Sequence, residues 1–202
     1  MNSVIRKTQP MLAPKAQGAL VLYLDFDGVL HPADVVRHAR RDSPGRAARA
    51  LPREIALGRA SQAAHALFEN AGLLEQALAP YPQVRIVLST SWVPTLGFER
   101  ALRFLPAGLV ARTAGATWHT RMAEDLPPAA RWERFARIPR GQQVLADVHR
   151  RGPAAWVALD DDPDGWGEAR AHLVATDPEH GLGHTEVYAN LVSLLARTFL
   201  TR

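Results

Sequence analysis

Three short stretches of nearly continuous apolar residues stand out from the mixed pattern of the rest of the chain. They run from Leu20 to Phe26, from Val84 to Ser89 and from Ala154 to Leu159, and an acidic residue or a serine closes or follows each one. Apolar runs of this length without alternation are typical of parallel strands that are buried on both faces. We therefore expect three central strands here, and weaker strands over residues 109–113 and 172–176.

Stretches with helical periodicity separate these runs. The pattern predicts helices over residues 61–79, 95–105, 141–151 and 185–200, with Thr185 as the N-cap residue of the last helix. Strands that alternate with helices form a parallel sheet with helices on both faces. The sequence therefore predicts an α/β fold with a doubly wound, Rossmann-like parallel sheet.

Two segments do not follow this rhythm. Residues 1–18 contain Pro10 and Pro14 and lack sustained periodicity, so we expect a flexible leader. The segment at about 31–60 is rich in Arg, Pro and Gly, and we expect a small cap-like insertion over the carboxyl end of the first strand. Residues 19–202 are then expected to form one domain, because 202 residues offer little material for a second full core.

Composition narrows the possible functions. The chain has no cysteine, which excludes disulfides, thiolate metal sites and cysteine nucleophiles. Because we see neither a long apolar run of about 18 residues nor a signal-like N-terminus, we expect a cytoplasmic protein that makes no contact with membranes. We also expect a monomer or a weak dimer. Scattered arginines carry nearly all of the positive charge. Nucleic-acid binding requires basic residues clustered on one face, which the sequence does not show, so the basic charge leaves such binding open.

Polar side chains follow the three main predicted strands. Asp25 and Asp27 stand at the end of the first strand, Ser89 at the end of the second, and three consecutive aspartates, 160–162, after the third. The carboxyl ends of parallel strands meet at the crevice where such sheets bind ligands. In an extended segment the Asp-x-Asp spacing places both carboxylates on one side, and Gly28 lets the backbone turn away directly. Carboxylates this close together require a cation, and Mg²⁺ suits them together with phosphate, to which Ser89 can donate a hydrogen bond.

These motifs resemble those of the haloacid dehalogenase-like (HAD) superfamily. The Asp-Phe-Asp-Gly-Val-Leu motif that begins at Asp25, the strand that ends in Ser89 and the strand before Asp160 and Asp161 carry the resemblance. Together with residues 115–117, they resemble in particular a bacterial subgroup related to the HAD domains of Swiss Army Knife RNA repair proteins. The resemblance covers residues 20–195, apart from the insertion.

The resemblance implies a Mg²⁺-dependent phosphatase that acts through an aspartyl-phosphate. Asp25 would be the nucleophile, and Asp27 would protonate the leaving group and then activate water. The metal ligands would be Asp25, the backbone carbonyl of Asp27 and the acids Asp160 and Asp161. The resemblance does not decide which of Asp160 and Asp161 binds the metal. Asp162 would orient the loop. The substrate would be a small phosphorylated metabolite or a nucleic-acid end.

One residue of the superfamily pattern is missing. HAD proteins normally supply a lysine from the start of the helix before the acidic strand, but the only lysines here are Lys7 and Lys15. We expect Arg140 to take its place, with Arg137 as the alternative, although a planar guanidinium is not equivalent to an ammonium. The other function to consider is therefore a catalytically weak or inactive HAD-fold protein with a binding or regulatory role.

Two residues close to the motifs have a structural and a functional interpretation. His31 and Trp92 follow the first and second motifs closely enough to line a pocket. A lone histidine or tryptophan at such a position more often serves packing, and we adopt that interpretation for both.

Overall fold

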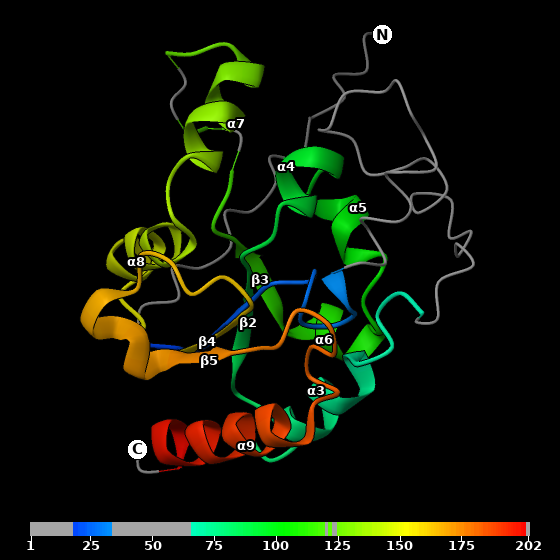
Figure 1. The fold of residues 1–202 in the computed structure, drawn as a ribbon. Coiled ribbons are helices and arrows are strands. Elements are labelled where there is room, and N and C mark those ends of the chain that lie inside the picture. Colours follow the sequence, from blue (N-terminus) through cyan, green and yellow to red (C-terminus); the bar gives the residue numbers. More distant parts are fainter. Residues whose placement is uncertain (1–17, 34–65, 120, 123–124, 201–202) are drawn as a thin grey trace, which may run out of the picture.

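A five-stranded parallel sheet forms the centre of the protein (Figure 1). The computed structural model describes residues 18–33, 66–119, 121–122 and 125–200. The strand order is β3-β2-β1-β4-β5, and every neighbouring pair is parallel. The strands are β1 (Leu20–Leu24), β2 (Arg85–Leu88), β3 (Thr113–Ala116), β4 (Ala155–Asp160) and β5 (Leu173–Ala175). The predicted α/β fold with a parallel sheet is confirmed.

Helices cover both faces of this sheet, which explains why its strands are apolar at consecutive positions. On one face Leu22 and Leu24 of β1 pack in a core with α3 (Ala71–Leu78) and α9 (Thr185–Phe199). On the other face Val21 and Tyr23 pack against α8 (Arg140–Arg151) and the short 3₁₀ helix η1 (Gly167–His172). Figure 1 shows α3 and α9 side by side beneath the sheet and α8 on the opposite side.

Four further helices complete the described part of the chain. They are α4 (Trp92–Leu96), α5 (Phe98–Leu102), α6 (Ala107–Arg112) and α7 (Pro128–Ala136). No helix in the described ranges is long and apolar enough to span a bilayer. The leader up to residue 17 and residues 34–60 of the expected insertion lie outside the described residues.

Several predicted element boundaries were wrong. Residues 109–112, expected as part of a strand, belong to α6, which buries only Leu109, and the strand starts at Thr113. The helix expected over residues 95–105 is divided at Gly97, whose φ of 92° is incompatible with a continuous helix. The helix expected from residue 61 begins at Ala71 within the described region. In α9, Thr185 is the first helical residue rather than the N-cap.

Candidate active site

The carboxyl edge of the sheet gathers acidic side chains from two adjacent strands. Asp25 directly follows β1, Asp160 is the last residue of β4, and Asp161 comes next. The Asp25 backbone N–H donates to the Leu159 carbonyl at 3.1 Å, so strand pairing fixes the nearness of these segments. Carboxylate oxygens of the three aspartates lie within 4.8 Å of one another.

Arg140 faces this group from the first residue of α8. Its Nη2 lies 3.5 Å from Oδ2 of Asp25, and its Nε lies 3.4 Å from Oδ2 of Asp160. A third nitrogen, Nη1, donates to Gln143 Oε1 at 3.1 Å, and Gln143 itself donates to the Ile138 carbonyl at 2.7 Å. The guanidinium is therefore held between two carboxylates, whereas the alternative Arg137 is exposed at the end of α7.

The electrostatics of the site reflect this crowding. Burial raises the pKa of the Asp25 carboxyl to about 7, the Arg140 guanidinium opposes that rise, and the Asp27 charge adds to it. Burial and the nearby Asp25 raise the pKa of Asp160, and burial and Asp27 raise that of Asp161. Although burial alone lowers the pKa of Arg140, the surrounding carboxylates raise it overall. The site thus favours an additional positive charge.

The donor set also indicates which cation would fit. Three carboxylates on a compact, largely buried edge are hard oxygen ligands, the type that Mg²⁺ takes together with phosphate oxygens and water. Cysteine, which would favour softer metals, is absent from the chain. The residues present therefore fit Mg²⁺.

Gly28 allows the two acidic loops to approach. Its φ is 70°, a left-handed conformation, and a Cβ atom there would overlap the carboxylate of Asp161. Its carbonyl accepts a hydrogen bond from the Thr176 hydroxyl at 2.7 Å. Any other residue would force the Asp161 side chain to shift. The sequence indicated a turn at Gly28 but not this contact.

Asp27 has a different environment from the three clustered aspartates. Its side chain is 25% exposed, and its Oδ1 accepts hydrogen bonds from Trp92 Nε1 at 3.0 Å and from His31 Nε2 at 3.1 Å. His31 and Trp92, which sequence reasoning assigned to packing, thus contact a predicted site residue directly. Only their position near the motifs pointed to the site.

Ser89 and Asp162 complete the residues singled out by the sequence. Ser89 directly follows β2, its backbone N–H donates to the Leu24 carbonyl at 2.7 Å, and it is fully buried. Its Oγ has no hydrogen-bond partner among the described residues, so a hydroxyl donor is available at the sheet edge. The Asp162 carboxylate accepts the Asp164 N–H at 2.9 Å and lies outside the three-aspartate group.

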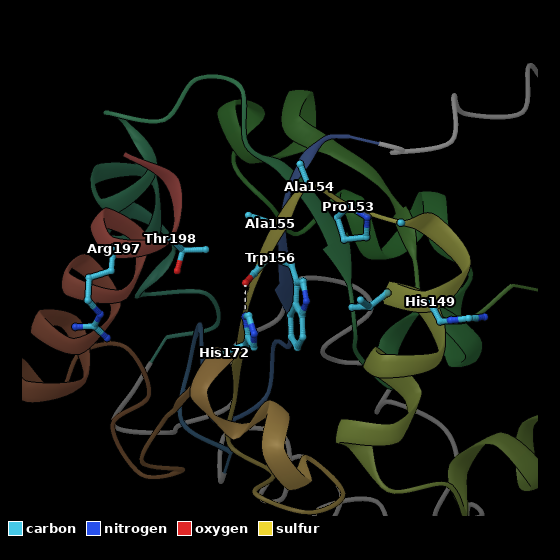
Figure 2. Close-up of a pocket in the computed structure, with 10 residues that line it drawn as sticks. His149, Pro153, Ala154, Ala155, Trp156, His172, Arg197 and Thr198 are labelled. Carbon is cyan, nitrogen blue, oxygen red and sulfur yellow. Dashed lines mark hydrogen bonds between the residues drawn. The ribbon is translucent and has the colours of Figure 1, made fainter. Parts of the chain in front are cut away.

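A separate hollow of about 530 Å³ lies at the opposite end of β4 (Figure 2). The residues that Figure 2 labels come from the end of α8, the loop between α8 and β4, the start of β4, η1 and the end of α9. Here His172 stacks on Trp156 with ring centroids 4.2 Å apart, and its Nδ1 lies 3.0 Å from the Trp156 carbonyl oxygen. Because it adjoins the amino end of β4, this hollow is not part of the acidic site.

Comparison with known proteins adds one finding. A family model described as "HAD domain in Swiss Army Knife RNA repair proteins" matches residues 21–187, a range that includes every site residue described above. No curated protein and no solved structure matches the chain.

Proposed function

The chain belongs to the family of HAD domains in Swiss Army Knife RNA repair proteins, and we propose that it is a Mg²⁺-dependent phosphohydrolase with Asp25 as its nucleophile. HAD domains are in general hydrolases of the phosphatase type. The observation that carries the proposal is the position of Asp25, buried at the sheet edge, with Oδ2 facing Arg140 and with Asp160 and Asp161 beside it.

In the proposed reaction the Asp25 carboxylate attacks the phosphorus atom. The bond from phosphorus to the leaving oxygen breaks as the aspartyl-phosphate forms, and Asp27 donates a proton to that oxygen. Asp27 then takes a proton from water, which attacks the phosphorus and releases phosphate and the free Asp25 carboxylate. Each step conserves atoms and charge with these two carboxyl groups alone.

Three further groups would stabilise the charge of the transferring phosphoryl group. Arg140 offers a guanidinium that already faces Asp25, and the buried Ser89 Oγ offers a hydroxyl hydrogen to a phosphate oxygen. Mg²⁺, when held by Asp25, Asp160, Asp161 and the Asp27 carbonyl, would supply the positive charge that phosphate oxygens need in the transition state.

The positive charge of Arg140 also argues against the alternative function, a binding protein without turnover. That alternative rested on the missing lysine, and the contact of Arg140 with both Asp25 and Asp160 supports turnover instead. We propose two classes of substrate, a small phosphorylated metabolite and a phosphorylated nucleic-acid end. The RNA repair proteins named in the family description favour including RNA and DNA ends in any substrate panel.

The test is phosphate release from p-nitrophenyl phosphate, followed by a panel of metabolites, nucleotides and phosphorylated RNA and DNA ends, with Mg²⁺ and with a chelator. Asp25→Asn should abolish release while thermal unfolding stays cooperative, because the substitution keeps the shape and removes the attacking oxygen. Asp162→Asn, the same substitution in the adjoining loop, is the matched control and should retain most activity. Full activity in a folded Asp25→Asn protein would falsify the mechanism.

A further inference from the structure

Among the residues that the structure describes, hydrogen bonds hold the Asp27 carboxylate through one oxygen only. Trp92 Nε1 donates to Oδ1 at 3.0 Å, and His31 Nε2 lies 3.1 Å from the same atom. Since an ionised carboxylate oxygen only accepts, His31 contributes its Nε2–H as the donor when Asp27 is ionised. Oδ2 takes no part in either hydrogen bond, and a quarter of the side chain is open to solvent.

Both donors are rigidly placed. Trp92 and His31 are fully buried, and the indole packs edge-on against Phe26, Phe68 and Phe104 at centroid distances of 5.7, 5.3 and 4.9 Å. The imidazole packs against Phe68 at 4.9 Å. Rings locked in this way keep their N–H groups directed at Asp27 without reorganisation, which is the condition for efficient proton transfer.

The origin of the two donors is also informative. His31 lies four residues after Asp27 on the same loop, whereas Trp92 begins α4, 65 positions further along the chain. A core that needed only apolar rings at these places could have used phenylalanine, as it does at the neighbouring Phe68 and Phe104. The indole and the imidazole direct their ring nitrogens at one oxygen of Asp27. We conclude that they hold this oxygen in place in addition to filling the core.

We propose that Trp92 and His31 are positioning residues for the proton transfer of Asp27, an inference that rests on the proposed function. They occupy Oδ1, so the transferable proton resides on Oδ2. From there it passes to the leaving oxygen as the phosphorus–oxygen bond breaks, and it returns from the attacking water. Loss of either donor lets the carboxyl group rotate and weakens the contribution of general acid catalysis.

The dependence on the leaving group separates this role from simple packing. A poor leaving group such as an alkoxide needs the proton, whereas p-nitrophenolate departs without it. We expect Trp92→Phe and His31→Leu to lower kcat/KM for alkyl phosphates by about tenfold or more, a part of the roughly 10²–10⁴-fold effect of general acid catalysis. For p-nitrophenyl phosphate the same variants should lose no more than about threefold, because proton donation contributes little there.

The experiment measures kcat/KM for a series of aryl and alkyl phosphates, since this parameter covers only the steps up to departure of the leaving group. His31→Gln restores an N–H donor near the position of Nε2 and should recover most of the loss seen in His31→Leu. Phe104→Leu is the packing control, because Phe104 contacts Trp92 without a hydrogen bond to Asp27, and it should change all substrates equally.

Two failures give different results. If the parent protein is active but Trp92→Phe and His31→Leu reduce kcat/KM equally for every leaving group, the positioning role is wrong and the phosphohydrolase proposal stands. If the parent protein hydrolyses no phosphomonoester, the proposed function is wrong and this inference with it. Should Trp92→Phe not fold, the comparison of His31→Leu with His31→Gln decides alone.

Discussion

Replacement of Arg140 by alanine is the perturbation that most directly probes the charge arrangement of the site. The guanidinium bridges Oδ2 of Asp25 and Oδ2 of Asp160 at 3.5 and 3.4 Å, and 16% of its side chain is exposed. Arg140→Ala removes one positive charge from beside three carboxylates and leaves the first turn of α8 otherwise intact, since alanine is a good helix former. Two quantities should respond, the turnover rate and the free energy of unfolding.

The magnitudes follow from the burial of the pair. Loss of one preorganised contact to the transferring group lowers turnover by on the order of a hundredfold or more. Breaking a buried ion pair by removing one partner costs about 3–5 kcal/mol of unfolding free energy. We expect a value near the lower end, about 3 kcal/mol, because the side chain is partly exposed and the carboxyl groups can take up protons.

The assay is steady-state hydrolysis of p-nitrophenyl phosphate with Mg²⁺, combined with urea unfolding of each variant. Arg140→Lys should retain part of the activity, because its charge survives while one ammonium cannot reproduce the fork that spans both aspartates. Arg137→Ala is the matched control, an exposed arginine three residues away, and should behave like the parent. A fully active Arg140→Ala protein would refute the reasoning, and strong impairment of Arg137→Ala alone would transfer the role to that residue.

Three other sets of substitutions test separate parts of the site. Asp27→Asn should lower turnover by about 10²–10⁴-fold and let phosphoenzyme accumulate with p-nitrophenyl phosphate, which intact mass measurement detects; turnover equal to the parent would remove Asp27 from proton transfer. Asp161→Ala and Asp160→Ala should each weaken Mg²⁺ binding by at least about tenfold. Calorimetry measures this affinity, and a larger loss in Asp162→Ala would contradict the ligand assignment. Gly28→Ala should lower the unfolding free energy by about 2–5 kcal/mol, from the positive φ and the overlap with Asp161; unchanged urea unfolding would argue against that close approach.

The central strands and their polar ends could be predicted because one physical signal determines both. A strand covered on both faces must be apolar throughout, as in β1, and a charged residue is tolerated only where the strand leaves the core. Asp25 and Asp160 therefore mark the same edge of the sheet even though 135 positions separate them in the numbering of the chain. The expectation of a site at this edge needed no knowledge of helix packing.

Contacts between distant side chains could not be predicted in this way. The hydrogen bond from Trp92 to Asp27 joins residues 65 positions apart, and the sequence identifies only two residue types that are compatible with many partners. The closeness of Gly28 and Asp161 likewise depends on the path of two loops. Local errors had a different cause: the apolar residues of α6 form too short a run to distinguish one helical turn from a strand.

The balance of charge at the sheet edge connects Arg140 with the proposed metal. Asp25, Asp160 and Asp161 carry three negative charges when ionised, and Arg140 supplies one positive charge. Two negative charges remain, which one divalent cation would neutralise and a monovalent cation would not. In both carboxylates Oδ1 accepts a backbone N–H: Phe26 donates to Asp25 at 2.7 Å, and Asp162 donates to Asp160 at 3.1 Å. The other oxygen, Oδ2, faces Arg140 in each carboxylate. The carboxylates that face Arg140 are also among those that could hold a metal ion. Because groups that share partners couple, Arg140 and Mg²⁺ should contribute to catalysis non-additively.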